Sequence, residues 1–207
     1  MIDRTNRAWA QLLSLAKLLL GERFQTTSSG DATGFSLLFE MNKLFEEFVG
    51  RSLARALAGT GYEVRLQGPR GYALADLHTG QNCFATKPDI TVARRGAPVL
   101  VIDTKWKRLK GAIDDPKYWV GQADVYQMMA YAHVYQCERL LLLYPHHAGL
   151  GSEEAGLTCV HRINGTNDSR IGVATLSLSN PKAAVRHLKD LLFLDALDVH
   201  PERYAAA

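Results

Sequence analysis

The chain has 207 residues, of which 47% are hydrophobic, and a formal net charge of +3. This length and apolar content suit one compact domain whose core is large enough to fold without a disulfide or a structural metal. The small positive charge is compatible with a polyanionic partner, but it does not identify one. The three cysteines form no CxxC pair and no Cys/His cluster, which argues against a zinc site and favours a reduced, cytoplasmic protein.

The first segment, residues 8–20, is an apolar run interrupted by Lys17. It has no signal-peptide cleavage site and is too short to span a bilayer, so we expect an amphipathic helix and no membrane association. The polar stretch that follows, residues 25–34, is rich in Gly, Ser and Thr and predicts a loop. We therefore expect residues 1–34 to form an N-terminal helix with a flexible connection, and residues 35–207 to form one globular domain.

Helical periodicity predicts helices at about residues 36–58, 122–136 and 181–197. Alternation or short apolar runs predict strands at residues 62–68, in both arms of a hairpin within residues 87–107, and at residues 139–145, 156–163 and 171–179. The sequence between Gly68 and Gly80 is rich in turn residues. Because helices and strands alternate irregularly around a central hairpin, we expect a mixed β-sheet flanked by helices.

The central hairpin carries an aspartate in each apolar arm. A three-residue loop at residues 95–97 would set Arg94 opposite Pro98 and, counting back, Asp89 opposite Asp103. Directly opposed residues share one face of the sheet with their Cβ atoms about 5 Å apart. A loop of two or four residues would break this match, so the inference depends on the parity of the turn.

Two facing carboxylates repel each other, and a divalent cation between them removes that cost. Mg²⁺ prefers oxygen ligands and uses one or two carboxylates together with water and phosphate oxygens, and Mn²⁺ is a substitute. Lys105 lies on the same face as Asp103 and could orient or deprotonate an attacking water, or neutralise charge in the transition state. The alternative is that Asp89 caps a strand end while Asp103 pairs with Lys105 or Lys107, without a metal.

Polar residues on two predicted helices extend this constellation. Glu46 follows Asn42 by one turn at the border of the apolar stripe, where it could reach over the sheet edge as a third acidic ligand, or remain a solvated acid. On the second helix, Gln127 and Tyr131 are also one turn apart, with Asp124 one turn earlier. This pair could hold the lysine or contact a DNA phosphate, or could be ordinary polar residues at the core edge.

The residues after the hairpin are basic. Lys107, Arg108 and Lys110 follow the lysine of the second arm, and phosphate contacts by such residues give sequence-independent binding to nucleic acid. Asn42 is a further candidate DNA contact. A solvated basic loop is the alternative interpretation of the three basic residues.

In combination, these motifs resemble the PD-(D/E)xK nuclease superfamily: Pro88-Asp89, then Asp103-Thr104-Lys105. The later Gln127 and Tyr131 are similar to the QxxxY motif of its RecB-like branch. The segments "FEMNKLFEEFV", "KPDI", "VIDTKWK", "DVYQMMAYAHVY" and "LLLLYP" more closely resemble the nuclease region of the McrC family, which cleaves DNA in McrBC-type restriction systems. The resemblance covers roughly residues 35–145.

The resemblance implies a restriction-endonuclease-like α/β/α fold and Mg²⁺-dependent endonuclease cleavage of double-stranded DNA. It also implies roles for six residues: the metal-binding acids Glu46, Asp89 and Asp103, the catalytic Lys105, and the supporting Gln127 and Tyr131. A catalytically silent DNA-binding subunit and a RecB-like exonuclease are the alternatives.

McrC-like proteins work with an AAA+ GTPase subunit, so the resemblance implies such a partner. The chain contains no GxxxxGK[ST] motif, so nucleotide hydrolysis would have to come from another polypeptide. Only about 35 residues precede the first motif, where McrC proteins carry a larger GTPase-docking region, so the chain is either part of a longer protein or a reduced member. Because a double-strand break requires two active sites, a homodimer is one arrangement that provides them.

Overall fold

The computed structural model describes residues 24–28, 33–37, 40–109, 120–150, 156–165 and 168–193. Contacts within the chain divide it into two units, residues 1–40 and residues 41–207. The described elements of the second unit are, in chain order, α2 (Met41–Ala56), β3 (Tyr62–Leu66), β4 (Gly71–Ala75), β5 (Asn82–Thr86), β6 (Ile90–Arg94), β7 (Ala97–Thr104), α3 (Gln122–Tyr135), β8 (Arg139–Pro145), the 3₁₀ turn η2 (Ala148–Leu150), β9 (Leu157–Arg162), β10 (Arg170–Leu176) and α4 (Pro181–Phe193). None of the described helices is long and apolar enough to cross a membrane.

The first unit contains an antiparallel hairpin of β1 (Phe24–Ser28) and β2 (Thr33–Leu37). The loop predicted for residues 25–34 is therefore wrong over these strands, because their threonines and phenylalanines favour extended structure despite the polar composition. The predicted helix start at Ser36 is also wrong, since Ser36 and Leu37 belong to β2 and α2 begins at Met41. The N-terminal helix expected at residues 8–20 lies outside the described residues.

Six strands form the central sheet, in the order β3-β6-β7-β8-β10-β9. The strands β3, β6 and β7 are antiparallel neighbours, β8 runs parallel to both β7 and β10, and β9 is antiparallel to β10. The four consecutive leucines of β8 are buried, as expected for a central strand that is covered on both faces. The predicted mixed sheet is confirmed.

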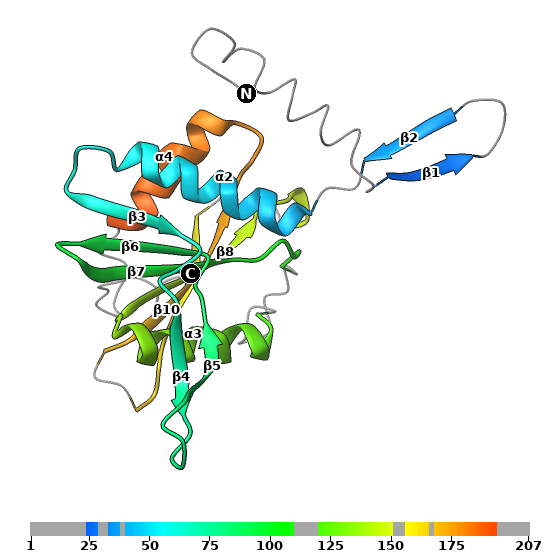
Figure 1. The fold of residues 1–207 in the computed structure, drawn as a ribbon. Helices are drawn as coiled ribbons and strands as arrows, with labels where there is room; N and C mark the ends of the chain where they lie inside the picture. Colours follow the sequence, from blue (N-terminus) through cyan, green and yellow to red (C-terminus); the bar gives the residue numbers. More distant parts are fainter. Residues whose placement is uncertain are drawn as a thin grey trace, which may run out of the picture. The chain divides into compact units, whose positions relative to one another are not determined.

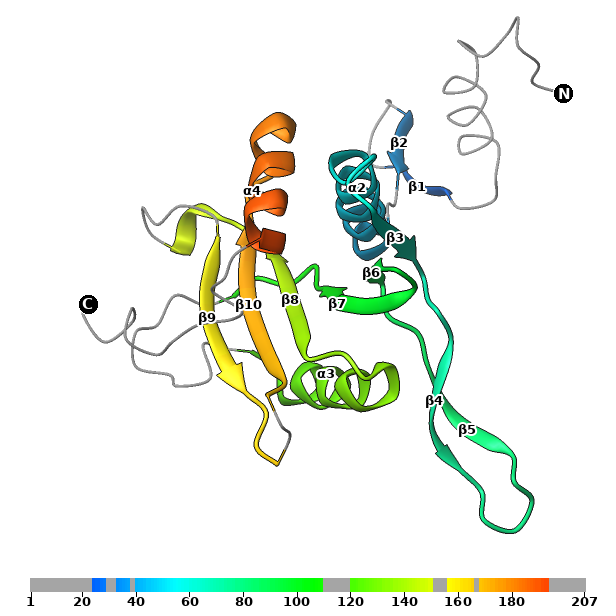
Figure 2. The ribbon, with the colours of Figure 1, turned by 90° about the vertical axis from the view of Figure 1, so that its left-hand side faces the viewer.

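Helices cover both faces of this sheet. Figures 1 and 2 show α2 and α4 on one face and α3 on the other. Each face has its own core: Ile90 and Ile102 belong to the cluster under α2 and α4, whereas Val101 belongs to the cluster under α3. The α/β/α arrangement predicted from the sequence is therefore confirmed. The final helix is described as far as Phe193, and the remainder of its predicted span lies outside the described residues.

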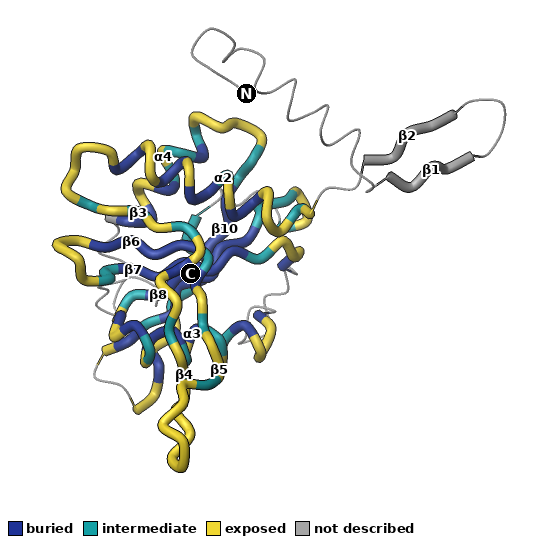
Figure 3. Tube along the Cα trace, in the orientation of Figure 1, coloured by how far each residue is buried: buried dark blue, intermediate teal, exposed yellow. Residues whose placement is uncertain are grey.

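A hairpin of β4 and β5 extends away from the sheet (Figure 2). Its tip is exposed, whereas the buried positions concentrate in the central strands (Figure 3). The base of the hairpin is attached to α3, because the hydroxyl of Tyr135 lies 2.9 Å from the carbonyl oxygens of both Pro69 and Thr86 and donates its one proton between them. The sequence predicted only turns between Gly68 and Gly80. In the structure this segment includes β4, on which the large side chains Tyr72 and Leu74 are exposed.

The central hairpin has the predicted register over most of its length, but its turn is shorter than predicted and one strand contains a bulge. Arg94 pairs with Ala97, so the turn has two residues and the predicted pairing of Arg94 with Pro98 is wrong. Both turn residues, Arg95 and Gly96, have positive φ, as a two-residue hairpin turn of the twisted type requires. Val99 then forms a bulge opposite Val92 and Ala93, which restores the predicted pairs Val92–Leu100 and Ile90–Ile102. The bulge therefore compensates for the shorter turn.

Candidate active site

Asp103 lies on the α3 face of the sheet, because it follows Ile102, which packs under α2 and α4, and pairs with Leu142 of the α3 core. Asp89 is the residue before β6, and the register between β6 and β7 ends at the pair Ile90–Ile102, so the predicted pairing of Asp89 with Asp103 stays a prediction. Asp103 is 1% exposed. The negative charge of Asp89 contributes to a raised pKa of Asp103, which agrees with two carboxylates placed near each other.

Thr104 fixes the carboxylate of Asp89. Its backbone N–H and its hydroxyl both donate to Asp89 Oδ2 at 2.8 Å. The backbone N–H of Gln67 donates to the carbonyl oxygen of Asp89 at 2.7 Å, which ties the segment before β6 to the end of β3. Among the described residues, no donor binds Asp89 Oδ1, so this oxygen is available to a ligand.

Lys105 supplies the counter-charge to Asp103. Its Nζ lies 2.6 Å from Asp103 Oδ2, as an ion pair, while that buried oxygen has no well-aligned hydrogen-bond donor in the described part of the chain. Burial, followed by the charge of Asp89, raises the pKa of Asp103 to about 6 despite the opposing effect of Lys105. A buried carboxylate that is only partly compensated is a strong candidate for a functional group.

A chain of hydrogen bonds from α3 orients Lys105. Its Nζ donates to Gln127 Oε1 at 2.8 Å, Gln127 Nε2 donates to the Tyr131 hydroxyl at 2.8 Å, and that hydroxyl donates to the Lys87 carbonyl oxygen at 3.1 Å. Because the tyrosine proton is used on a carbonyl, the amide nitrogen must face Tyr131 and the amide oxygen must face Lys105. Of the two roles suggested for Gln127 and Tyr131, holding the lysine matches this geometry.

Asp124 is a site residue that the sequence reasoning placed on the right helix but did not select. Its buried carboxylate accepts two hydrogen bonds from Lys107 Nζ, at 2.9 and 3.0 Å, and lies 3.5 Å from Lys105 Nζ. The signal was available, since Asp124, Gln127 and Tyr131 are spaced i, i+3 and i+7 and therefore share one face of the helix.

Glu46 lies on α2, which covers the face of the sheet opposite to α3. It is buried, and Gln67 Nε2 donates a hydrogen bond to its Oε1. Burial raises the pKa of Glu46, Gln67 opposes this effect, and the charge of Asp89 adds to it. The described residues contain no group of three or more His, Cys, Asp and Glu side chains placed to hold a metal ion. Ligation by Glu46 therefore stays a prediction.

The four residues suggested as DNA contacts have different environments. Asn42 and Arg108 are exposed. The side chain of Lys107 is also exposed, but its ammonium is bound to Asp124. Lys110 lies outside the described residues.

The carboxylates of Asp89 and Asp103 fit a hard divalent cation. Within the described part of the chain, Asp89 offers an oxygen to which no hydrogen-bond donor is bound, and Asp103 offers a buried oxygen that is paired with the ammonium of Lys105. Mg²⁺ is typically bound by one or two carboxylates with water and phosphate oxygens, so two such ligands suffice.

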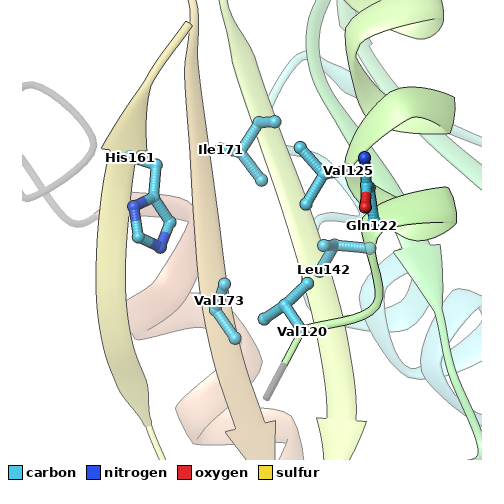
Figure 4. Close-up of a pocket in the computed structure, with 7 residues that line it drawn as sticks. All are labelled: Val120, Gln122, Val125, Leu142, His161, Ile171 and Val173. Atoms are coloured by element: carbon cyan, nitrogen blue, oxygen red, sulfur yellow. The ribbon is translucent and has the colours of Figure 1, made fainter. Parts of the chain in front are cut away.

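An apolar pocket lies on the α3 side of the sheet, and Figure 4 shows the side chains that line it. Leu142 on β8, which pairs with Asp103, forms part of the pocket. The cavity volume is about 420 Å³. The lining residues are Val120, Gln122, Val125, Leu142, His161, Ile171 and Val173. The acidic site is therefore bordered by an apolar surface on the side of β8 and β10.

The mixed sheet with helices on both faces is an α/β fold consistent with a PD-(D/E)xK-like core. The family described as "McrBC 5-methylcytosine restriction system component" matches residues 1–145. The chain belongs to this family.

A solved structure supports the fold. It is the "Refined half-complex from tetradecameric assembly of Thermococcus gammatolerans McrB AAA+ hexamers with bound McrC". The similarity has a TM-score of 0.59 at 19% sequence identity and covers 93% of this chain and 39% of the matched chain. This chain therefore spans well under half the length of the protein that it matches. No curated protein matches the chain significantly.

Proposed function

We propose that this chain is the DNA-cleaving component of an McrBC-type restriction system, a Mg²⁺-dependent endonuclease that acts on double-stranded DNA in the cytoplasm. The observation that supports this best is the ion pair between Lys105 and the buried Asp103, with the charge of Asp89 close enough to raise the pKa of Asp103 and the lysine held in place from α3. Membership of the restriction family is consistent with this chemistry.

Asp89 and Asp103 would hold the metal, with Glu46 as a third ligand. Bound Mg²⁺ would activate water and stabilise charge at the phosphate, and Mn²⁺ would substitute for it. Thr104 keeps the Asp89 carboxylate in a fixed orientation for this task. Gln127 and Tyr131 restrict the position of the Lys105 ammonium.

Lys105 is suited to stabilising negative charge. Burial lowers its pKa, but the hydrogen bond and charge of Asp103 and the charges of Asp124 and Asp89 outweigh this effect, so the pKa is raised overall. The side chain therefore carries a positive charge at neutral pH. A fixed ammonium beside the scissile phosphate would stabilise the charge that builds in the transition state.

We further propose an McrB-like AAA+ partner, because the matched solved structure contains McrB AAA+ hexamers with bound McrC. That partner would supply nucleotide hydrolysis. Two copies of this chain, as a homodimer or within a larger complex, would cleave both strands.

The test is cleavage of covalently closed plasmid DNA carrying 5-methylcytosine, with Mg²⁺ or Mn²⁺ and purified protein. We expect the wild type to nick or linearise the plasmid and Lys105→Met to lose this activity. Lys182→Met, on the exposed surface of α4, is the matched control. Equal cleavage by Lys105→Met and wild type would contradict the proposal. Degradation of linear DNA with closed circles untouched would identify an exonuclease instead.

Metal uptake provides a readout that does not depend on a partner. Calorimetric titration with Mn²⁺ should show binding to the wild type and a loss of binding in Asp89→Asn and Asp103→Asn. Absence of uptake by the folded wild type would favour the catalytically silent subunit.

A further inference from the structure

Asp124 contacts both Lys105, the proposed catalytic lysine, and Lys107, a candidate DNA contact. It lies in the first turn of α3, one turn before Gln127, and is 5% exposed. Its carboxylate contacts Lys107 at 2.9 Å and Lys105 at 3.5 Å. No motif considered in the sequence assigns a function to this position.

The backbone after β7 brings both lysines to Asp124. The N–H of Lys105 donates to the Leu143 carbonyl oxygen at 2.9 Å, which continues the pairing with β8. The N–H of Lys107 then donates to the Lys105 carbonyl oxygen at 2.9 Å, which closes a three-residue turn. The turn places the Lys107 side chain beside α3, where its ammonium reaches the carboxylate of Asp124.

Asp124 and Lys107 form an asymmetric pair. The side chain of Lys107 is 59% exposed, whereas that of Asp124 is 7% exposed. An exposed lysine normally samples many rotamers, but this ammonium donates to both oxygens of a carboxylate fixed in a helix. An ammonium has three donors, so two are used on Asp124 and one remains for a ligand outside the protein.

We infer that Asp124 is a positioning residue: it holds Lys107 beside the acidic site as a preorganised contact for a DNA phosphate. This inference rests on the proposed function. Preorganisation strengthens binding because the side chain has already lost its rotamer freedom before the ligand arrives. The same carboxylate balances charge between the two lysines, which allows Lys107 to lie close to Lys105.

The loss of the Asp124 charge and the loss of Lys107 positioning change DNA affinity in opposite directions. Neutralising a carboxylate beside a phosphate-binding site makes the site more positive, so it should strengthen DNA binding whether or not Lys107 is positioned. The coupling between Asp124 and Lys107 therefore separates the two accounts, whereas the effect of Asp124→Asn by itself does not.

The experiment is a double-mutant cycle of Asp124→Asn and Lys107→Met. Binding of a fluorescent DNA duplex is measured by anisotropy in EDTA, which prevents metal-dependent cleavage, over a series of KCl concentrations. In the wild-type background, Lys107→Met should weaken binding roughly 2- to 10-fold and reduce the slope of log K against log salt by about one. In the Asp124→Asn background, the same change should have less than half this effect on affinity.

An equal or larger effect of Lys107→Met in the Asp124→Asn background would overturn the inference. A wild-type protein without salt-dependent DNA binding would instead overturn the proposed function. If Asp124→Asn fails to fold, the rates at which Lys107 and Lys182 of the wild type are acylated test the inference instead. Lys107 should react more slowly with an amine-acylating reagent than the exposed Lys182, because its ammonium must first leave the carboxylate. Equal reactivity would refute the positioning of Lys107.

Discussion

Asp103→Asn should stabilise this protein in the absence of metal. Burial and the charge of Asp89 raise the pKa of Asp103 from its ordinary value of 3.8 to about 6, so the ionised form is disfavoured in the folded state. Each pKa unit corresponds to about 1.4 kcal/mol, so the ionised Asp103 destabilises the folded wild type by roughly 3 kcal/mol at pH 7.5. For a chain of 207 residues, this predicts an increase in Tm of roughly 6–12 °C.

The pH dependence has a defined sign. Well below pH 3.8 the carboxyl of Asp103 is protonated in both the folded and the unfolded state, so the wild type and Asp103→Asn should be about equally stable. The stability difference between Asp103→Asn and the wild type grows as the pH rises from 3.8 to about 6, because over this range Asp103 ionises mainly in the unfolded state. Above about pH 6 the difference is constant. Thermal unfolding in EDTA at a series of pH values measures it.

Glu63→Gln is the matched control, because it removes one negative charge from an exposed position on β3 and should change Tm little. Added Mg²⁺ should stabilise the wild type but not Asp103→Asn, since a ligand stabilises only the form that binds it. The reasoning would be refuted if Asp103→Asn lowered Tm, or left it unchanged, at pH 7.5 in EDTA.

Three further changes test other parts of the structure. Thr104→Val removes one of the two donors to Asp89 and should weaken Mn²⁺ binding measured by calorimetry, with the melting temperature as a check on folding. Tyr135→Phe should lower the free energy of unfolding by about 0.5–1.5 kcal/mol in urea titrations, because the partly buried hydrogen bond at the base of the β4–β5 hairpin is lost. Leu143→Ala should lower it by about 2–5 kcal/mol in the same titrations, since Leu143 is fully buried; a loss below 1 kcal/mol would show that the core collapses around the gap.

The sequence was sufficient to predict features that depend on short-range periodicity. Alternation along a strand determines which residues share a face, so the shared face of the paired Ile90 and Ile102 followed from the predicted register. The four leucines of β8 indicated a strand buried on both faces. The nuclease-like motifs pointed to the family that the comparison then showed.

Other features depend on contacts between distant segments. The predicted turn was one residue too long, and only the bulge at Val99 preserved the expected register. The large side chains Tyr72 and Leu74 of β4 are exposed, so they gave no sign of a packed strand, and the base of the β4–β5 hairpin is attached through Tyr135 on a helix far along the chain.

The sequence by itself determined the order of the elements from β3 onward, apart from β4 and β5, and the residue types that can bind a metal, because these follow from local periodicity and side-chain chemistry. The tertiary structure decided which charges compensate one another. Lys105 and Lys107 both reach Asp124 only because β7 and α3 pack together, and no spacing along the chain encodes a contact between segments that are brought together by folding.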